Sequence, residues 1–420
     1  MSGLLFGIFL LVLAALGAPV FALIGCLALA LFHAVGISSA AVMIEFFRLA
    51  SLPALIAIPL FTFAGFLLAE SKAPQRLLEL AEACVGWLPG GLALGSLATC
   101  ALFTAFTGAS GVTIIALGGL LYPMLRKQGY PKRFTLGLLT TTGSLGLLFP
   151  PSLPIILYGL VAKVSIDRLF KAALLPGVML LVILGAYALW TGRRAGIARH
   201  RFSLRRLAAA ARAAAWEIPL PFLIVGGIYA GWFTASEAAA VMAFYVLVVE
   251  TLVHRDLALK DLPRVIAHSM TLVGAILIVL GTALGLTNYL VDAEIPTRLF
   301  AWLHAYVGSK TVFLLGLNAF LLVVNMVEIF SAIIIVVPII VPVAAQYGID
   351  PIHLGVLFLL NLEIGYMTPP LGLNLFLSRN RFDAPLHTLY GAILPFWLLM
   401  LGALALVTYV PRLSLCLLTP

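Results

Sequence analysis

Oxygen-bearing side chains gather at four places in a chain whose other residues are mostly apolar. In the first half of the chain they occur with glycines and a proline, at Thr107, Gly108, Ser110, Gly111, Thr142, Gly143, Gly146, Pro150 and Ser152. In the second half they occur at Asn325, Glu328, Ser331, Asn361, Gly365, Thr368, Pro369, Gly372 and Asn374. Hydroxyl, amide and carboxylate oxygens are hard ligands that suit hard cations, and glycine lets a backbone approach a ligand closely. These residues are therefore candidates for binding an ion or a small polar solute.

The composition predicts that these residues lie inside a membrane. Of the 420 residues, 63% are hydrophobic and 10% are charged, whereas a soluble domain is about half apolar and a quarter charged. Unbroken apolar runs such as Leu4 to Phe32 and Leu174 to Trp190 do not fit the alternating strands of a membrane barrel. The sequence therefore predicts an all-α polytopic membrane protein. The net charge of +9 lies in short clusters between apolar runs, which is typical of membrane orientation and does not indicate nucleic acid.

The chain contains two copies of one unit, on either side of an Arg-rich interruption at residues 191–212. Pro123, Gly129, Gly146, Pro150 and Pro151 recur 219 residues later as Pro342, Gly348, Gly365, Pro369 and Pro370. Upstream, the segment Pro74 to Leu77 recurs 222 residues later as Pro296 to Leu299, which requires a three-residue insertion. Internal repeats of this kind are common in membrane transporters.

Each unit begins with a spanning helix, predicted at about Phe46 to Leu68 and at about Ile266 to Leu290. An apolar run follows, Gly90 to Leu125 in the first copy and Thr311 to Ala345 in the second, and each run is interrupted by one of the polar clusters. Two interpretations fit such a run. It can cross the membrane twice, or it can form one re-entrant hairpin with the polar cluster at its tip.

The next segment of the unit is predicted to be a broken helix. Phe134 to Phe149 and Leu153 to Val164 are each too short to span about 30 Å of hydrocarbon at about 1.5 Å per residue. Together they make one discontinuous helix that breaks at Pro150-Pro151.

The distribution of cations favours the hairpin interpretation. If each apolar run returns to its own side, most cationic clusters fall on one face, which is then the cytoplasmic face. From the start of the first copy at Phe46 to the start of the second at Ile266, the chain crosses five times, in Phe46 to Leu68, the broken helix, Leu174 to Trp190, Pro219 to Phe233 and Ala238 to Val253. An odd number of crossings makes the repeats inverted. The first hairpin then opens from the cytoplasm and the second from outside, with their tips near mid-membrane.

These elements predict five segments. They are an N-terminal membrane helix region (1–45), a first inverted repeat (46–192) with a hairpin at about 90–125, a basic cytoplasmic linker (193–216), connecting helices (217–264), and a second inverted repeat (265–420) with a hairpin at about 311–345.

Backbone breaks inside a bilayer explain why the polar residues gather where they do. Each unsatisfied N–H or C=O in hydrocarbon costs several kcal/mol. Half-helix N-termini can bind an anion, and half-helix C-termini with unwound carbonyls can hold Na⁺. Among the acidic residues, Glu328 could cap a half-helix as well as contact an ion, and Glu363 could pair with a neighbouring helix. Glu237, in Thr234-Ala235-Ser236-Glu237, is predicted to begin a helix.

Five motifs carry a resemblance to a known family. They are Phe106-Thr-Gly-Ala-Ser-Gly111, Lys127-Gln-Gly-Tyr130, Gly146-Leu-Leu-Phe-Pro-Pro-Ser152, Glu237-Ala-Ala-Ala240 and Asn361-Leu-Glu-Ile-Gly-Tyr-Met-Thr-Pro-Pro-Leu-Gly-Leu-Asn-Leu375. Over essentially the whole chain they resemble the large membrane subunit of tripartite ATP-independent periplasmic (TRAP) transporters, the DctM-like family.

The resemblance implies sodium-driven uptake of a small organic acid across a bacterial inner membrane by an elevator mechanism. It implies two protein partners, a small four-helix membrane subunit and a periplasmic substrate-binding protein, besides the surrounding lipid. It implies Na⁺ as the coupling ion and no organic cofactor. One sodium region corresponds to the first tip with the Thr142 to Gly146 segment, and the other to the second tip with the Asn361 to Thr368 segment. The expected sodium ligands are Ser110, Thr142, Gly146, Asn361, Gly365 and Thr368, and the substrate is expected between the two regions.

Three other functions compete with this one. A membrane-embedded enzyme is disfavoured because the chain has no HExxH, Walker A or nucleophile-elbow motif. A passive channel and a transporter can be distinguished by two observations: whether uptake saturates, and whether it requires sodium and a binding protein. A stand-alone sodium/dicarboxylate elevator carrier would work without either partner subunit.

Overall fold

The computed structural model describes residues 2–198, 201–324 and 329–418, and these residues form helices and connecting turns without strands. Six helices in this part of the chain are long and apolar enough to cross a membrane, or up to eight spans if two bent helix pairs each count as one. The protein is thus a multi-pass helical membrane protein, as its composition predicts. Asn325 and Glu328 lie outside the described residues.

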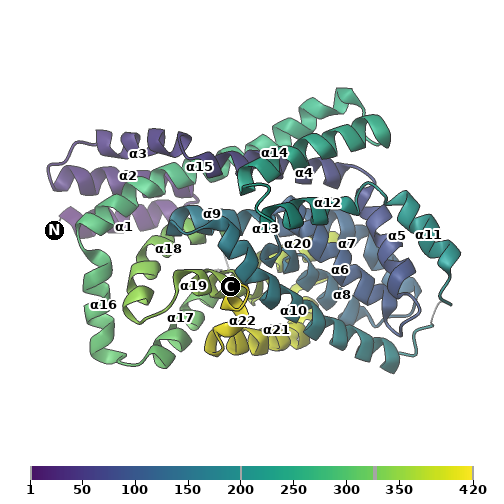
Figure 1. Ribbon diagram of the computed structural model, residues 1–420. Coiled ribbons are helices and arrows are strands. Elements are labelled where there is room, and N and C mark those ends of the chain that lie inside the picture. The colour runs from purple at the N-terminus through teal and green to yellow at the C-terminus, as the bar shows by residue number, and fades with distance from the viewer. Residues whose placement is uncertain (1, 199–200, 325–328, 419–420) are drawn as a thin grey trace.

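Two groups of helices face each other in the fold (Figure 1). The first group, which we call the frame, lies along the upper edge of the view. It contains α2 (Val20–Ala34), α3 (Ala40–Ala50), α4 (Ala57–Glu70), α14 (Ala235–Val248) and α15 (Leu262–Asp292). Within the frame, α15 packs on α2, α3 and α4, and α4 packs on α14. Helix α1 (Ser2–Ala15) contacts α2 at its end.

The second group, which we call the core, holds the residues predicted to bind ligands. Its part from the first repeat comprises α6 (Gly91–Thr107), α7 (Ser110–Lys127), α8 (Lys132–Thr142), η2 (Leu145–Leu148), α9 (Leu153–Ala162) and α10 (Ile166–Arg194). Its part from the second repeat comprises α17 (Lys310–Val324), α18 (Ile329–Gln346), α19 (Pro351–Gly365), α20 (Leu373–Phe382) and α21 (Leu386–Tyr409), followed by α22 (Arg412–Leu415). Frame and core meet mainly where α4 contacts α6 and α15 contacts α18.

The repeat found in the sequence is also a repeat of secondary structure. Helix α18 ends 219 residues after α7, at Gln346 and Lys127 respectively. The contacts are reciprocal as well. Helix α7 packs on α20 while α18 packs on α9, and α8 packs on α21 while α19 packs on α10. Reciprocal contacts between equivalent elements are typical of an approximate two-fold relation.

Two short helices flank the core. Helix α5 (Ala73–Val85), with the amphipathic α11 (Leu204–Ala213) beside it, lies at one side, and α16 (Ile295–Tyr306) lies at the other (Figure 1). These two helices hold equivalent places in the repeat but pack differently, because α5 contacts α6 whereas α16 contacts α18. The pair formed by α16 and α17 bends by 116°.

The broken helix is confirmed where the sequence predicts it. Helix α8 with η2 and helix α9 together are long enough for one span and bend by 45° at the Pro150-Pro151 break. The predicted start at Glu237 is also confirmed, because Thr234 and Glu237 form a capping box at the beginning of α14. Such a box satisfies two of the free N–H groups of the first turn.

Two predicted spans and one apolar run are divided or shorter in the structure. The span predicted at Phe46 to Leu68 is divided, because α3 ends at Ala50 and a new helical segment begins at Pro53 (η1, Pro53–Ile56), where proline cannot continue the preceding hydrogen-bond ladder. The run Leu4 to Phe32 is two helices separated by Gly17 and Pro19. The segment Pro219 to Phe233 is a short helical stretch of α12 (Pro219–Pro221), η3 (Phe222–Gly226) and α13 (Gly227–Tyr229).

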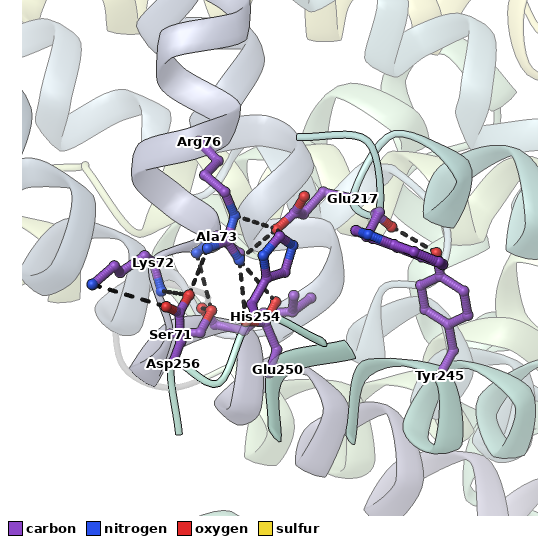
Figure 2. A network of polar contacts seen from close by, with 11 residues as sticks. Ser71, Lys72, Ala73, Arg76, Glu217, Tyr245, Glu250, His254 and Asp256 are labelled. Atoms are coloured by element: carbon purple, nitrogen blue, oxygen red, sulfur yellow. Dashed lines mark hydrogen bonds and ion pairs between the residues drawn. The ribbon is translucent and has the colours of Figure 1, made fainter. Parts of the chain in front are cut away.

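A network of charged side chains fastens α5 to the segment that follows α14 (Figure 2). The Arg76 guanidinium contacts Glu217 and Asp256 at 2.5 Å each and Glu250 at 3.1 Å. Both glutamate side chains are about 1% exposed, and Arg76 is 12% exposed. Burial alone would lower the pKa of Arg76, but the hydrogen bond to Asp256 and the charges of Glu217 and Glu250 hold that pKa above its ordinary value.

Candidate functional site

The two polar interruptions predicted as hairpin tips line a single cavity of about 620 Å³. The first tip contributes Gly108, Ser110 and Gly111, and the second contributes Ile329 and Ser331. The walls include repeat-related residues, since Leu147 and Tyr366 both line the cavity and differ by the repeat offset. Residues of the frame close the remaining side, namely Val20, Phe66, Leu272, Ala275, Ile276 and Val279. The cavity therefore lies between core and frame.

The first tip consists of two half-helices joined by two residues. Helix α6 ends at Thr107, Gly108 turns with φ of 65°, and α7 begins at Ser110. Glycine is required at this turn, because a Cβ on Gly108 would also lie 2.5 Å from the side chain of Leu153. The first N–H groups of α7 therefore lie beside the cavity, and such groups favour an anion.

At the second tip the described residues resume at Ile329, within α18, and the backbone N–H of Ile329 donates to the hydroxyl of Tyr366 at 3.0 Å. Tyr366 follows α19 and lines the same cavity. Its role could not be predicted from its residue type, since a tyrosine inside a Pro/Gly-rich motif is compatible with many positions. Gly372 is needed beside it, because a Cβ there would lie 2.5 Å from the Tyr366 carbonyl oxygen.

The polar residues of the first repeat form a buried layer behind the first tip. Thr104 donates to the Gly143 carbonyl at 3.0 Å, and its oxygen lies 2.7 Å from that of Thr113. These bonds join α6 and α7 to the break after α8. The hydroxyl of Thr142 donates to Leu139 O at 3.3 Å within its own helix. Thr104 could not be singled out from the sequence, because threonine in an apolar helix usually bonds its own backbone.

The second repeat places its polar residues in an equivalent layer. Asn361, on α19, donates to Asn318 Oδ1 and to Leu357 O, each at 2.8 Å. Asn374, at the start of α20, donates to Thr140 O at 3.2 Å. Thr368 donates to Ile364 O at 2.7 Å and accepts a hydrogen bond from Trp397 at 2.9 Å, so its hydroxyl is already engaged.

Several buried oxygens in these layers have no hydrogen-bond partner among the described residues. They are Thr107 Oγ1, Ser152 Oγ, Asn361 Oδ1, Asn374 Oδ1 and both carboxyl oxygens of Glu363. All six belong to side chains that are 0% exposed. A buried polar group without a partner costs about 1–3 kcal/mol, and native proteins have few of them. Unpartnered oxygens at two helix breaks have the chemistry of a site for a dehydrated hard cation.

The predicted site residues therefore divide into two sets. Gly108, Ser110, Gly111 and Ser331 line the cavity. Thr107, Thr142, Gly143, Gly146, Ser152, Asn361, Gly365 and Asn374 are buried in the core instead. Gly146 is required by packing, because a Cβ there would meet the backbone of Ala101 and Ala105. Pro150 and Pro369 mark the breaks, and Gly372 supports the turn at Tyr366.

The sequence is similar to known transport proteins along most of its length. The profile described as "Tripartite ATP-independent periplasmic transporter, DctM component" matches residues 7–413. A C4-dicarboxylate TRAP transporter large permease of Pseudomonas aeruginosa is 37% identical over 94% of this chain and 92% of its own length. An ectoine/5-hydroxyectoine TRAP transporter large permease of Ruegeria pomeroyi is 32% identical over 86% of this chain and 85% of its own length.

A solved structure is similar in fold. The YdaH transporter of Alcanivorax borkumensis superposes with a TM-score of 0.64 at 15% sequence identity, covering 88% of this chain and 86% of that one.

Proposed function

The chain belongs to the DctM component family of tripartite ATP-independent periplasmic transporters, which are membrane permeases and not enzymes, and we propose that it imports a small organic carboxylate with a sodium gradient. The observation that carries this proposal is the cavity shared by the two tips, with unpartnered oxygens buried behind it. The relatives are named for different solutes, C4-dicarboxylate and ectoine among them.

The cavity suits an anion. Helix α7 begins beside it, at Ser110. The N-terminus of a helix presents free N–H groups and the positive end of the helix dipole. Such an end beside the cavity favours a solute with a carboxylate group, held by backbone donors and by the hydroxyl of Ser110.

The buried oxygens suit sodium as the coupling ion. Asn361 and Asn374 in the second repeat, and Thr107 and Ser152 in the first, have oxygens that could replace water around Na⁺. Backbone carbonyls at Gly146 and Gly365 are further candidates because they lie at the breaks. Bound sodium would neutralise negative charge next to the substrate, so that ion and anion favour each other's binding.

An elevator motion is supported by the division between core and frame. The repeats have reciprocal contacts, and the cavity lies at the boundary where the core meets α4 and α15. We propose that the repeats are inverted and that the core slides along the frame, so that the same cavity opens to either side. On this proposal the first tip faces the cytoplasm and the second faces outside.

The partners follow from the family. We propose that a small four-helix membrane subunit and a periplasmic binding protein work with this chain in the bacterial inner membrane. Reconstitution into proteoliposomes tests this directly. Vesicles with all three proteins and a sodium gradient should take up a C4-dicarboxylate, whereas vesicles that lack the binding protein or the gradient should show little uptake. Sodium-driven uptake by this chain alone would identify a stand-alone carrier and contradict the proposal.

A further inference from the structure

A line of buried amide and hydroxyl groups runs through the second repeat from α21 to the proposed ion site. Asn318 on α17 donates from Nδ2 to Thr408 Oγ1 on α21 at 2.9 Å. Its Oδ1 accepts from Asn361 Nδ2 at 2.8 Å. Thr408 and Asn361 are 0% exposed and Asn318 is 9% exposed. Neither Asn318 nor Thr408 belongs to the motifs at the breaks.

Along this line, from Thr408 through Asn318 to Asn361, each hydrogen bond determines which group of the next side chain donates and which accepts. The hydroxyl of Thr408 donates to Leu404 O at 2.7 Å within its own helix, and in this arrangement Thr408 Oγ1 accepts from Asn318. The NH₂ group of Asn318 must therefore point toward Thr408, which turns its Oδ1 toward Asn361. The NH₂ group of Asn361 then points toward Asn318, and its second proton is held by Leu357 O at 2.8 Å.

This orientation decides which atom of the Asn361 amide is left without a partner. Its NH₂ group is fully used, and its Oδ1 is buried without a partner among the described residues. If the Asn361 amide were flipped, its oxygen would face the oxygen of Asn318. The amide would then lose both hydrogen bonds that its NH₂ group donates. Two amides in series have only one satisfied arrangement here.

The first repeat does not need such an orienting hydrogen-bond partner. The residue equivalent to Asn361 is Thr142, 219 positions earlier. A hydroxyl presents the same oxygen whichever way its proton points, whereas an amide presents an oxygen or two protons. An orienting partner is therefore required only where the ligand is an amide.

We propose that Asn318 and Thr408 are positioning residues that aim the Asn361 carbonyl oxygen at the coupling ion. This inference rests on the proposed sodium coupling and deepens it. Thr408 acts through Asn318, and Asn318 acts through Asn361, so neither contacts the ion itself. Loss of either partner weakens the hold on this orientation, which the bond from Asn361 to Leu357 O then maintains with less support.

The test measures sodium binding on the purified protein in detergent. The apparent melting temperature is followed against sodium concentration, with choline replacing sodium at constant ionic strength. Thr408→Val removes the acceptor while keeping the side-chain shape. We expect the sodium concentration for half-maximal stabilisation to rise by about ten-fold, because one hydrogen bond of roughly 1–1.5 kcal/mol corresponds to about that factor. Thr408→Ser should restore the parent value.

Thr62→Val is the matched control. Thr62 is also fully buried and donates to the carbonyl four residues earlier at 2.7 Å, but it lies on α4 in the frame. It should leave the sodium midpoint unchanged. Asn318→Leu provides a second variant with the same expected rise, should Thr408→Val not fold. In an Asn361→Ala background, Thr408→Val should add no further change, because its effect passes through Asn361.

The outcomes separate the inference from the proposed function. If the parent is not stabilised by sodium and its uptake in the complete tripartite system does not depend on sodium, the proposed coupling fails. If the parent responds to sodium but Thr408→Val and Asn318→Leu have the parent midpoint, the coupling stands and the positioning role is wrong. A Thr408→Val effect that persists in the Asn361→Ala background would also contradict the inference.

Discussion

The side chain of Ser144 donates a hydrogen bond to the backbone oxygen of Glu363 at 3.4 Å, and these two residues are 219 positions apart. That separation is the repeat offset, so each residue contacts its own equivalent. In a two-fold arrangement a residue can do so only beside the axis. On the proposal that the repeats are inverted, the axis that relates them passes between the breaks that follow α8 and end α19. Glu363 is fully buried there, and its carboxyl has no hydrogen-bond partner among the described residues.

The charged network around Arg76 is expected to be a major source of stability. Arg76→Met leaves Glu217 and Glu250, both about 1% exposed, without their cation. Removing one partner of a buried ion pair typically costs about 3–5 kcal/mol. The apparent melting temperature in detergent should fall by several degrees. Arg264→Met is the control, because its pair with Glu70 is 59% and 34% exposed and such pairs contribute about 0–1 kcal/mol. An equal fall in melting temperature for the two variants would contradict a major stabilising role of the Arg76 network.

The same network predicts an acid dependence of stability. Burial alone would raise the pKa of Asp256, but the hydrogen bonds from Arg76 and from the Lys72 backbone hold that pKa below its ordinary value. A carboxyl with a lowered folded-state pKa stabilises the protein above its unfolded-state pKa of about 3.9, and that stability is lost as pH falls through the folded-state pKa. The melting temperature of the parent should therefore decline as the pH falls from about 5 toward 3. The difference in melting temperature between the parent and Arg76→Met should shrink over that range. A constant difference would contradict a contribution of the network to the acid dependence.

The contact between frame and first tip predicts a steric effect at Gly65. A Cβ on Gly65 of α4 would lie 2.6 Å from the Cα of Thr107 at the tip. Gly65→Ala should displace the tip, at about 1–3 kcal/mol for overpacking, and should lower both the melting temperature and the uptake rate. Gly274→Ala in α15 is the control, because a methyl group added there would have no atom within 4 Å. A Gly65→Ala protein that behaves like Gly274→Ala would show that α4 and the tip do not pack closely in the membrane.

Local signals in the sequence predicted the breaks, whereas contacts between distant helices could not be predicted. Pro150-Pro151 and the cluster at Gly108 interrupt helices by their own geometry, so their consequences are visible in the sequence. Asn318 and Thr408 are 90 positions apart, and each looks like an isolated polar residue in an apolar run. Their hydrogen bond forms only because α17 and α21 come together against α19.

The division of the predicted span at Phe46 to Leu68 shows a second limit. Its hydrophobicity is continuous, but Pro53 starts a new helical segment after a turn at Ser51 and Leu52. Apolar composition reports burial or lipid contact and does not report where a helix ends. Pro53 coincides with a boundary here, whereas Pro176 and Pro395 lie inside continuous helices, so neither a proline nor the length of the run identifies a boundary alone.

The central claim is that the core carries the cavity past a fixed frame, and a reversible crosslink tests it most directly. Phe66 on α4 and Ile115 on α7 both line the cavity, one from each side of the boundary. In a protein whose native cysteines are replaced, cysteines at these two positions can be joined by a short reducible thiol crosslinker. The control joins Gly25→Cys to Thr282→Cys within the frame, where the two Cβ positions are 4.0 Å apart and suit a disulfide.

Uptake is measured in proteoliposomes that contain the complete tripartite system, before crosslinking, after it, and after reduction. If the core must move, the bridge between Phe66→Cys and Ile115→Cys abolishes uptake and reduction restores it, while the bridge inside the frame leaves uptake unchanged. Full uptake with the bridge between core and frame complete would contradict an elevator motion, because the cavity would then open without movement of the core.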